Sequence, residues 1–400
     1  MTAPRVVVAG AGPVGLSTAL FLVERGFAVT VLEKLPALAE DMRASTFHPA
    51  TLDLLEPRGI AARIADEGHR ARQWQYLRLD IRDAAVFDLG VLAGETAHPY
   101  RLQCEQFRLT RAIAERLRNE PLFDIHFGAE LVGLDATGDG IEIEATGKGG
   151  PMRVRGDYLV GADGAASAVR RLLGMDLVGT TYPKTSITVV VDFPFDMHLP
   201  DMLFVNYVWT ADDHYSLMRI SRHWRTGFSP VDGQSIEEAL ATTNVRRRLA
   251  RIVSAAGDAS IVHVGAYTIQ RRVADTFRTG RVLLAGDAAH LNSPAGGMGM
   301  NSGIQDGYSL ARALHAAFSG DDTALDRYAA VRREVAIGEV HAQSDRNYRR
   351  HREKDPVQRE AIWRELKAVT ADRQRMKDYL MESAMIALVA RSRVAEGGGR

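Results

Sequence analysis

The first 33 residues contain the feature that most restricts the fold, a glycine-rich turn between an apolar strand and a helix. Residues 6–9 are apolar, and Gly10, Gly12 and Gly15 follow them with the spacing G-x-G-x-x-G. A helix with an apolar face is expected at residues 14–25, and a second strand ends at Glu33. A strand, a glycine turn, a helix and an acid roughly 20 residues further on are typical of a dinucleotide-binding βαβ unit. The pattern predicts an α/β fold with a nucleotide site; a tight turn without a ligand is the alternative.

A second glycine-rich stretch lies near the other end of the chain, at residues 286–301. An apolar run at 281–285 precedes it and predicts a buried strand, and apolar residues at helical spacing follow from residue 300 to 318. Glycines let the backbone approach a flat ligand, and a helix start favours an anion. Asp287 at the strand end can accept hydrogen bonds from sugar hydroxyls. One cofactor that touches both distant stretches must be long, which favours a flavin dinucleotide.

The chain between these stretches predicts a third turn and a second layer. Residues 157–164 combine a strand with a glycine turn that contains Asp163, and a helix is expected at 167–173. Residues 125–160 predict a small antiparallel sheet. Alternating or β-rich segments at 73–90 and 180–274 predict a separate sheet, and residues 331–393 predict charged helices. The basic runs at 246–248 and 349–352 lie in helical segments among acids, so we interpret both as solvated faces.

Composition limits the classes of partner. The chain has 400 residues, 46% of them hydrophobic and 25% charged, with a formal net charge of zero. These values are ordinary for a soluble globular protein and argue against a nucleic-acid or membrane-surface partner. The single cysteine, Cys104, excludes an internal disulfide and favours a reducing, cytoplasmic setting. We expect no membrane span, no signal peptide and no metal site, because neither an apolar run of roughly 18 residues nor a metal-ligand spacing occurs.

The three turns together resemble those of the single-component FAD-dependent aromatic hydroxylases, the class A flavoprotein monooxygenases typified by p-hydroxybenzoate hydroxylase. The resemblance covers about residues 1–340. Its motifs are the first glycine turn with Glu33, then G-A-D-G-x-x-S-x-V-R at residues 161–170, and last G-D-A-A-H at 286–290 with Pro294 and the loop 296–301. One departure is visible: the family often has two prolines in that loop, and here Ser293 precedes Pro294.

The resemblance implies an α/β fold in which a Rossmann-like FAD-binding domain is interleaved with a β-sheet substrate domain, followed by C-terminal helices. The expected FAD-binding parts are residues 1–72, 98–178 and 275–340. The expected substrate-domain parts are residues 73–97 and 179–274, and residues 341–400 form the helical segment.

The same resemblance assigns cofactor-binding roles. It implies that the first turn approaches the FAD pyrophosphate, that an acid holds the adenosine ribose, and that the late motif lines the ribityl chain and isoalloxazine. The residues of the first turn are Gly10, Gly12, Pro13, Val14 and Gly15, and those at the ribose are Glu33 and Lys34. Arg43 and Gln106 are implied near the pyrophosphate and the flavin side, and Asp163 is implied in handling both FAD and NAD(P)H. The residues of the late motif are Gly286, Asp287, Pro294, Gly297, Gly299, Met300 and Asn301.

The implied activity is the hydroxylation of a small phenolic or heteroaromatic substrate, with NADH or NADPH and molecular oxygen, through a flavin C4a-hydroperoxide. A helix start near Gly299 is expected to stabilise the anionic reduced flavin. The acceptor of the substrate proton stays open among Tyr207, His214 and Tyr215. Arg219 is a candidate for a substrate carboxylate or for a surface ion pair, and Pro294 joins the catalytic candidates.

Three alternatives remain at this stage. The first is a flavin-dependent dehydrogenase or reductase of the same fold without oxygen transfer. The second is a flavin-binding redox sensor whose charged helical tail is a partner surface. The third, an enzyme that uses only NAD, is disfavoured by the late motif. A homodimer is compatible with the sequence, which does not identify the ring substrate.

Overall fold

The computed structural model describes residues 3–40, 42, 44–147, 149–183, 185–199 and 201–397. Arg43, which the resemblance places near the pyrophosphate, lies outside the described residues. Among those residues, none of the helices combines the length and the apolarity that crossing a bilayer requires.

A six-stranded, mostly parallel sheet positions all three glycine turns. Its order is β20 (Arg278–Thr279), β21 (Val282–Leu284), β12 (Tyr158–Gly161), β1 (Arg5–Ala9), β2 (Ala28–Glu33) and β8 (Phe123–Phe127). β1 pairs in parallel with β2 and β12, and β12 pairs in parallel with β21. Because the carboxyl ends of parallel strands meet at one edge of a sheet, the turns after β1, β12 and β21 converge there.

Two long helices pack tightly beside this sheet. α1 (Pro13–Val23) follows β1, and α9 (Met298–Phe318) follows the late glycine loop. Glycines in α9 allow the close approach, since a Cβ built on Gly307 would lie 2.2 Å from Thr18 Oγ1. α4 (Gln106–Leu117) also packs on α1. The helix start that the sequence placed near Gly299 is at Met298.

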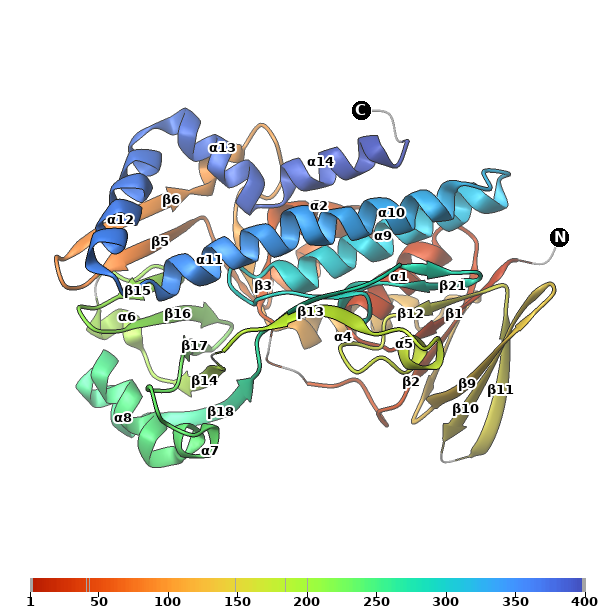
Figure 1. Ribbon diagram of the computed structural model, residues 1–400, viewed down its shortest axis with the longest axis horizontal. Coiled ribbons are helices and arrows are strands. Elements are labelled where there is room, and N and C mark those ends of the chain that lie inside the picture. Colours follow the sequence, from red (N-terminus) through yellow and green to blue (C-terminus); the bar gives the residue numbers. More distant parts are fainter. Residues whose placement is uncertain are drawn as a thin grey trace.

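A seven-stranded sheet forms the second layer. Its order is β18 (Ser260–Tyr267), β14 (Ser186–Asp192), β17 (His223–Phe228), β16 (His214–Ile220), β15 (Val205–Trp209), β5 (Gln73–Arg78) and β6 (Asp83–Asp88). The parallel pair of β5 and β15 joins strands from two distant parts of the chain. One face packs on α7 (Ile236–Leu240) and α8 (Thr242–Ile252), and the other packs on α12 (Pro356–Ala371) and α13 (Arg373–Ser383), as Figure 1 shows.

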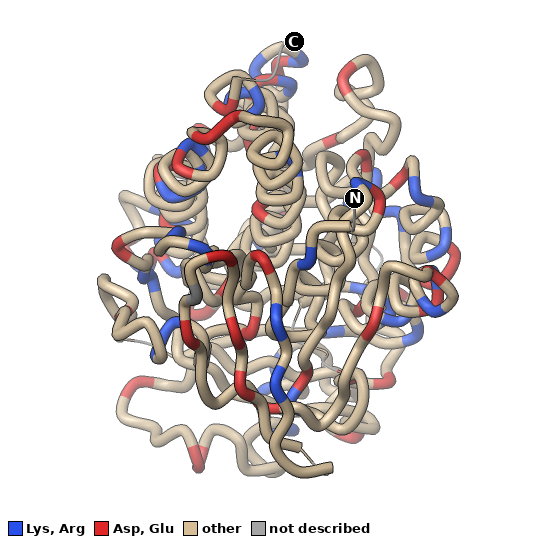
Figure 2. Tube along the Cα trace, turned by 90° about the vertical axis from the view of Figure 1, so that its right-hand side faces the viewer, with Lys and Arg blue, Asp and Glu red and all other residues tan. Residues whose placement is uncertain are grey.

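The other strands and α-helices complete the fold. The strands are β3 (Thr46–Phe47), β4 (His69–Ala71), β7 (Arg101–Gln103), β9 (Glu130–Thr137), β10 (Gly140–Gly147), β11 (Gly150–Gly156), β13 (Leu177–Thr181), β19 (Gln270–Ala274) and β22 (His290–Leu291); the helices are α2 (Pro49–Leu55), α3 (Ile60–Ala65), α5 (Ala168–Leu172), α6 (Phe195–His198), α10 (Ala324–Val335), α11 (Ala342–Arg352) and α14 (Ile386–Ala395). Basic and acidic positions are interspersed on the side of the molecule seen in Figure 2. The predicted α/β class, with parallel and antiparallel sheets and C-terminal helices, is confirmed.

The basic run at 349–352 corrects the expectation of a solvated face. Arg349 is exposed, but Arg350 donates a hydrogen bond to Tyr379 Oη at 2.8 Å and the His351 carbonyl accepts one from Trp209 Nε1 at 2.9 Å. The run is the last turn of α11, and one helical turn presents side chains in every direction. Three of its four residues therefore lie against the seven-stranded sheet and α13 rather than in solvent.

Candidate active site

A cavity of about 730 Å³ lies at the sheet edge where the three glycine turns meet. This volume is in the range of sites that enclose a cofactor, about 300–1,000 Å³. Most of the expected cofactor-binding residues line it: Gly10, Gly12, Pro13, Val14, Glu33, Lys34, Gln106, Asp163, Asp287, Pro294, Gly297, Gly299 and Met300. The cavity therefore brings together residues from all three motifs, from Gly10 to Met300 along the chain.

The first glycine turn has no room for a side chain at two of its positions. A Cβ on Gly15 would lie 1.9 Å from the carbonyl oxygen of Gly10, and a Cβ on Gly10 would lie 2.6 Å from that of Ala162. Gly12 faces open space on the cavity side. Gly15 does not line the cavity, so its part is to let α1 approach the turn.

Two acids at the sheet edge are fixed by backbone donors. The Glu33 carboxylate accepts hydrogen bonds from the N–H of Ala11 at 2.7 Å and of Leu35 at 2.9 Å. Asp163 Oδ2 accepts one from the N–H of Ala168 at 2.6 Å. Asp163 Oδ1 is buried and has no partner among the described residues. A buried carboxylate oxygen requires a donor, and a ligand with hydroxyl groups in this cavity supplies one, so the residues fit a dinucleotide.

Two polar side chains behind the cavity, those of Asn301 and Asp306, hold the backbone of the late glycine motif. Asn301 accepts from the His48 N–H at 2.9 Å and donates to the carbonyls of Thr46 at 2.8 Å and Gly297 at 2.7 Å. Gly286 donates its N–H to Asp306 Oδ2 at 3.0 Å. Asn301 and Gly286 do not line the cavity, so the geometry favours a supporting part for both rather than direct contact with the cofactor.

His48 holds the same loop from the other side. Its Nε2 lies 2.8 Å from the carbonyl oxygen of Gly296. Burial, with the nearby charge of Arg101, lowers the pKa of His48 to about 3. The ring is therefore neutral at pH 7, and its Nε2–H donates to the Gly296 carbonyl.

Thermal stability is expected to fall as the pH falls from about 6.5 toward 4. Burial lowers the pKa of His48 to about 3, and the pKa values of His214 and His341 to about 4. Since an unfolded histidine has a pKa of about 6.5, the unfolded chain binds more protons in this window. Stability that is present above pH 6.5 is lost as the pH approaches the native values.

Thermal unfolding followed by circular dichroism at a series of pH values measures this effect. His48→Asn is expected to flatten the curve in that window, whereas His198→Asn, at an exposed position of α6, is the matched control and is expected to leave it unchanged. An unchanged slope in the His48 variant would contradict the assignment.

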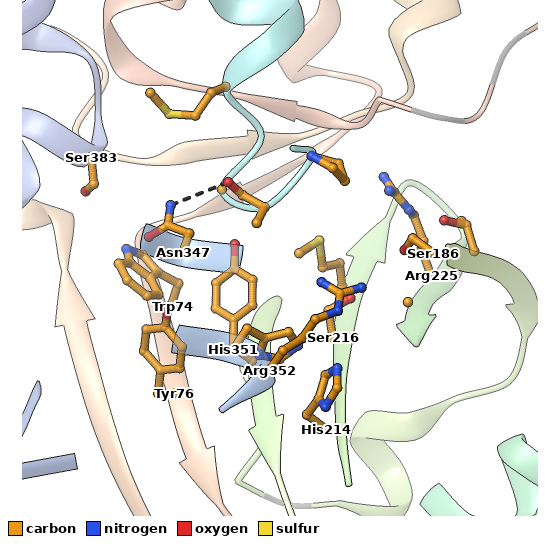
Figure 3. A pocket seen from close by; sticks show the side chains of 18 of the residues that line it. Trp74, Tyr76, Ser186, His214, Ser216, Arg225, Asn347, His351, Arg352 and Ser383 are labelled. Atoms are coloured by element: carbon orange, nitrogen blue, oxygen red, sulfur yellow. Dashed lines mark hydrogen bonds between the residues drawn. The ribbon is translucent and has the colours of Figure 1, made fainter. Parts of the chain in front are cut away.

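A smaller pocket of about 90 Å³ adjoins the large cavity. It lies between the seven-stranded sheet and helices α11 and α13, and Figure 3 shows side chains from both sides converging on it. Six residues line both spaces: Tyr207, Met218, Arg225, Tyr267, Pro294 and Met298. A ligand in the small pocket therefore sits next to the loop of Pro294 to Met298, which also borders the large cavity.

The structure brings together three of the five catalytic candidates. Tyr207, His214 and Pro294 line the small pocket. Tyr215 is buried in the core on the α7–α8 face of the sheet, and the Arg219 guanidinium lies 5.7 Å from the centre of the Trp224 ring. Successive side chains of a strand point to opposite faces. Tyr215 and Arg219 therefore leave the set of candidates, while Tyr207, His214 and Pro294 stay proposals.

The sequence analysis did not single out His351, whose ring lies next to those of His214 and Tyr207 in the pocket. Its ring centre lies 5.0 Å from that of His214 and 5.5 Å from that of Tyr207. His214 Nε2 and His351 Nδ1 are buried and have no hydrogen-bond partner among the described residues. Burial lowers the pKa of His214 to about 4, and burial next to His214 lowers that of His351 as well. Both rings are therefore neutral at pH 7, and each offers a nitrogen that can accept a hydrogen bond.

Comparison with known proteins defines the class. Residues 4–342 match the family model of the FAD binding domain. Para-nitrophenol 4-monooxygenase of Pseudomonas sp. (strain WBC-3) is 30% identical over 384 residues, 94% of each chain. 6-Hydroxy-3-succinoylpyridine 3-monooxygenase HspB of Pseudomonas putida (strain DSM 28022 / S16) is 28% identical, over 94% of this chain and 96% of that one.

A solved structure of similar fold is also that of a monooxygenase, like the two relatives. The crystal structure of p-nitrophenol 4-monooxygenase PnpA from Pseudomonas putida DLL-E4 has a TM-score of 0.88 and 29% identity, and the match covers 96% of this chain and 98% of that one. The chain therefore belongs to the FAD-binding domain family. More particularly, it is an oxidoreductase of the flavin-dependent monooxygenase class, with FAD as its cofactor, which confirms the expectation from the sequence motifs.

Proposed function

We propose that this monooxygenase hydroxylates a phenol or a hydroxylated heteroaromatic compound with a single ring, with NADH or NADPH as the reductant and molecular oxygen as co-substrate. The observation that carries the proposal is the pocket of about 90 Å³ beside Pro294. An engineered cavity of about 150 Å³ holds one benzene molecule, so a pocket of about 90 Å³ has no room for a fused polycycle and takes a single ring because it opens into the flavin cavity. The relatives that act on nitrophenol and on a hydroxypyridine support this substrate class.

The residues that fit FAD divide the cavity into parts. Gly10 and Gly12 would hold the pyrophosphate, Glu33 the adenosine ribose and Asp287 the ribityl chain. The first turn of α9 would place the positive end of a helix near the isoalloxazine. When bound, FAD takes the hydride from NAD(P)H and activates oxygen.

The chain itself orients the ring, excludes water and handles the phenolic proton. Trp74, Tyr76 and Tyr379 wall the pocket with aromatic surface, which excludes water from the reacting ring. His214 and His351, whose unpartnered nitrogens are buried in this pocket, would accept the hydrogen of the phenol hydroxyl, and Tyr207 lines the same pocket. Removal of this proton makes the ring electron-rich and ready for hydroxylation.

Turnover of a phenol panel tests the proposal. We expect a yellow protein whose NADH or NADPH oxidation is accelerated by single-ring phenols and yields a hydroxylated product. His351→Asn is expected to lower kcat at least about 100-fold, the usual share of a general base, without changing the FAD content. Exposed His198→Asn is the matched control. Reduction of another acceptor without a phenol would favour the dehydrogenase alternative, and bound flavin without turnover would favour the sensor.

The setting of the enzyme is part of the same proposal. The single cysteine, Cys104, is buried and makes no disulfide, which supports a reducing, cytoplasmic setting. The homodimer stays a prediction, which gel filtration tests. The choice between NADH and NADPH stays open, and parallel assays with the two nucleotides decide it.

A further inference from the structure

The small pocket is lined by three arginines and by no carboxylate. Arg101, Arg225 and Arg352 face it, and its lining, all of it within the described residues, contains no aspartate or glutamate. Arg225 donates to Ser45 Oγ at 2.9 Å, and Arg352 donates to Ser229 Oγ at 3.0 and 3.2 Å. A neutral hydroxyl does not balance a guanidinium charge, so the pocket carries an excess of positive charge.

The three arginines lie in different parts of the site. Arg225 lines both the pocket and the flavin cavity, and Ser45 lines the flavin cavity too, so this charge acts at their junction. Arg101 stacks 4.4 Å from the centre of the Trp74 ring and lowers the pKa of His48 behind the flavin loop. Arg352 lines only the small pocket, beside the proposed proton acceptor His351, as Figure 3 shows.

Groups around Arg352 leave its charge unbalanced. The guanidinium lies 4.3 Å from the centre of the Tyr348 ring, and burial raises the pKa of that phenol, which keeps it neutral. His214 and His351 are neutral at pH 7. Tyr267 also faces Arg352. Lys354 adds a positive charge near His214, and it forms an ion pair with Asp232 at 3.2 Å.

Asp213, the acid next to His214 in the sequence, is already paired with another arginine. Asp213 forms an ion pair with Arg248 at 2.7 Å. Burial lowers the pKa of Arg352 itself, the effect of removing a cation from water without a counter-charge. Since a buried charge is paired in stable proteins, a ligand is the natural source of the missing anion.

We propose that the substrate binds as an anion and that Arg352, on the last turn of α11, binds its anionic oxygen. This inference rests on the proposed function and narrows it to phenols that carry a negative oxygen. That oxygen is either a carboxylate on the ring, which leaves the phenolic proton to His214 and His351, or the phenolate itself, which needs no proton acceptor. Both fit the planar fork of a guanidinium.

Equilibrium binding to the FAD-loaded enzyme without NAD(P)H tests the inference separately from turnover. The ligands are 4-nitrophenol, 4-hydroxybenzoate and the neutral ester methyl 4-hydroxybenzoate, followed through the change in flavin absorbance or by calorimetry. Binding of 4-nitrophenol that strengthens as the pH rises through the pKa of its phenol identifies the phenolate. Tight, pH-independent binding of 4-hydroxybenzoate identifies the carboxylate.

Variants of one helix locate the charge. Arg352→Met is expected to raise the Kd of the preferred anion at least about tenfold, the equivalent of one lost charged contact, and to change the Kd of the ester less than about twofold. Arg352→Lys is expected to recover part of the affinity. Arg349→Met, at a side chain that is 75% exposed on the same helix, is the matched control.

Two results would overturn the inference: anions that bind no tighter than the ester, or an Arg352→Met variant that weakens the ester and the anion equally. Anion binding that depends on Arg352 in an enzyme that hydroxylates no phenol would instead overturn the proposed function and keep the anion site.

Discussion

Replacement of Gly15 by alanine is expected to lower the affinity for FAD roughly 100-fold and to release the cofactor during purification. A Cβ at this position would lie 1.9 Å from the carbonyl oxygen of Gly10 and 3.0 Å from its carbonyl carbon. Both atoms are backbone and cannot rotate away, so the turn itself must move. A loss of about 2.8 kcal/mol in binding corresponds to two orders of magnitude, within the range for strain at a special backbone position. The ratio of flavin to protein absorbance, and titration of the apoprotein with FAD, measure it.

Two other glycines serve as controls for this result. Gly94 is exposed and has no atom within 4 Å of a built Cβ, so Gly94→Ala is expected to keep FAD. Gly12 also has open space in the protein but lines the cavity, so Gly12→Ala is expected to lower FAD affinity while the apoprotein keeps its melting temperature. Wild-type affinity in Gly15→Ala would show that the turn tolerates the shift and that the close approach of α1 is unimportant.

The sequence predicted the FAD cofactor and the three glycine turns because these features are built from local patterns. Each glycine turn follows its own apolar strand within a few residues, so periodicity and spacing reveal it. Parallel pairing then brings the turns after β1, β12 and β21 to one edge. The roles of Asn301 and Gly286 were less predictable, since a motif does not show whether a residue contacts the ligand or holds the loop behind it.

The substrate side could not be predicted to the same depth, because it depends on contacts between distant segments. His351 is fixed by a hydrogen bond between its carbonyl and Trp209, 142 residues earlier in the chain, and no periodic signal records such a pair. Alternation in β16 shows that His214 and Tyr215 point to opposite faces. It does not show which face the tail covers, and this explains why Tyr215 and Arg219 stood among the candidates.

A substitution at Asp306 is expected to have the second large effect, because this residue joins the late glycine motif to the buried core. Asp306 is fully buried and accepts hydrogen bonds from the Gly286 N–H at 3.0 Å, His290 Nε2 at 2.9 Å and Arg332 Nε at 2.7 Å. Burial alone would raise the pKa of Asp306, but Arg332 and His290 outweigh it and lower the pKa to about 2. The carboxylate is therefore charged at pH 7.

Asp306→Asn is expected to lower the free energy of unfolding by about 3–5 kcal/mol, the effect of leaving a buried charge without its partner. Arg332 is 1% exposed and would lose its hydrogen-bonded carboxylate, and Glu396 would act on its charge only through space. Urea unfolding of the enzyme in excess FAD measures the change. As a control, Asp232→Asn removes an ion pair with Lys354 whose side chains are 70% and 63% exposed, and it is expected to change stability by less than about 1 kcal/mol.

The double variant Asp306→Asn, Arg332→Met separates charge from shape. If the unpaired guanidinium causes the loss, removal of both charges is expected to recover part of the stability lost in Asp306→Asn, since two residues in contact do not act additively. If the double variant is no more stable than the single one, the loss arises instead at Gly286 and His290, where the carboxylate holds the turn. FAD content distinguishes the two causes: restored stability with FAD still lost would show that Asp306 holds the glycine turn independently of its ion pair.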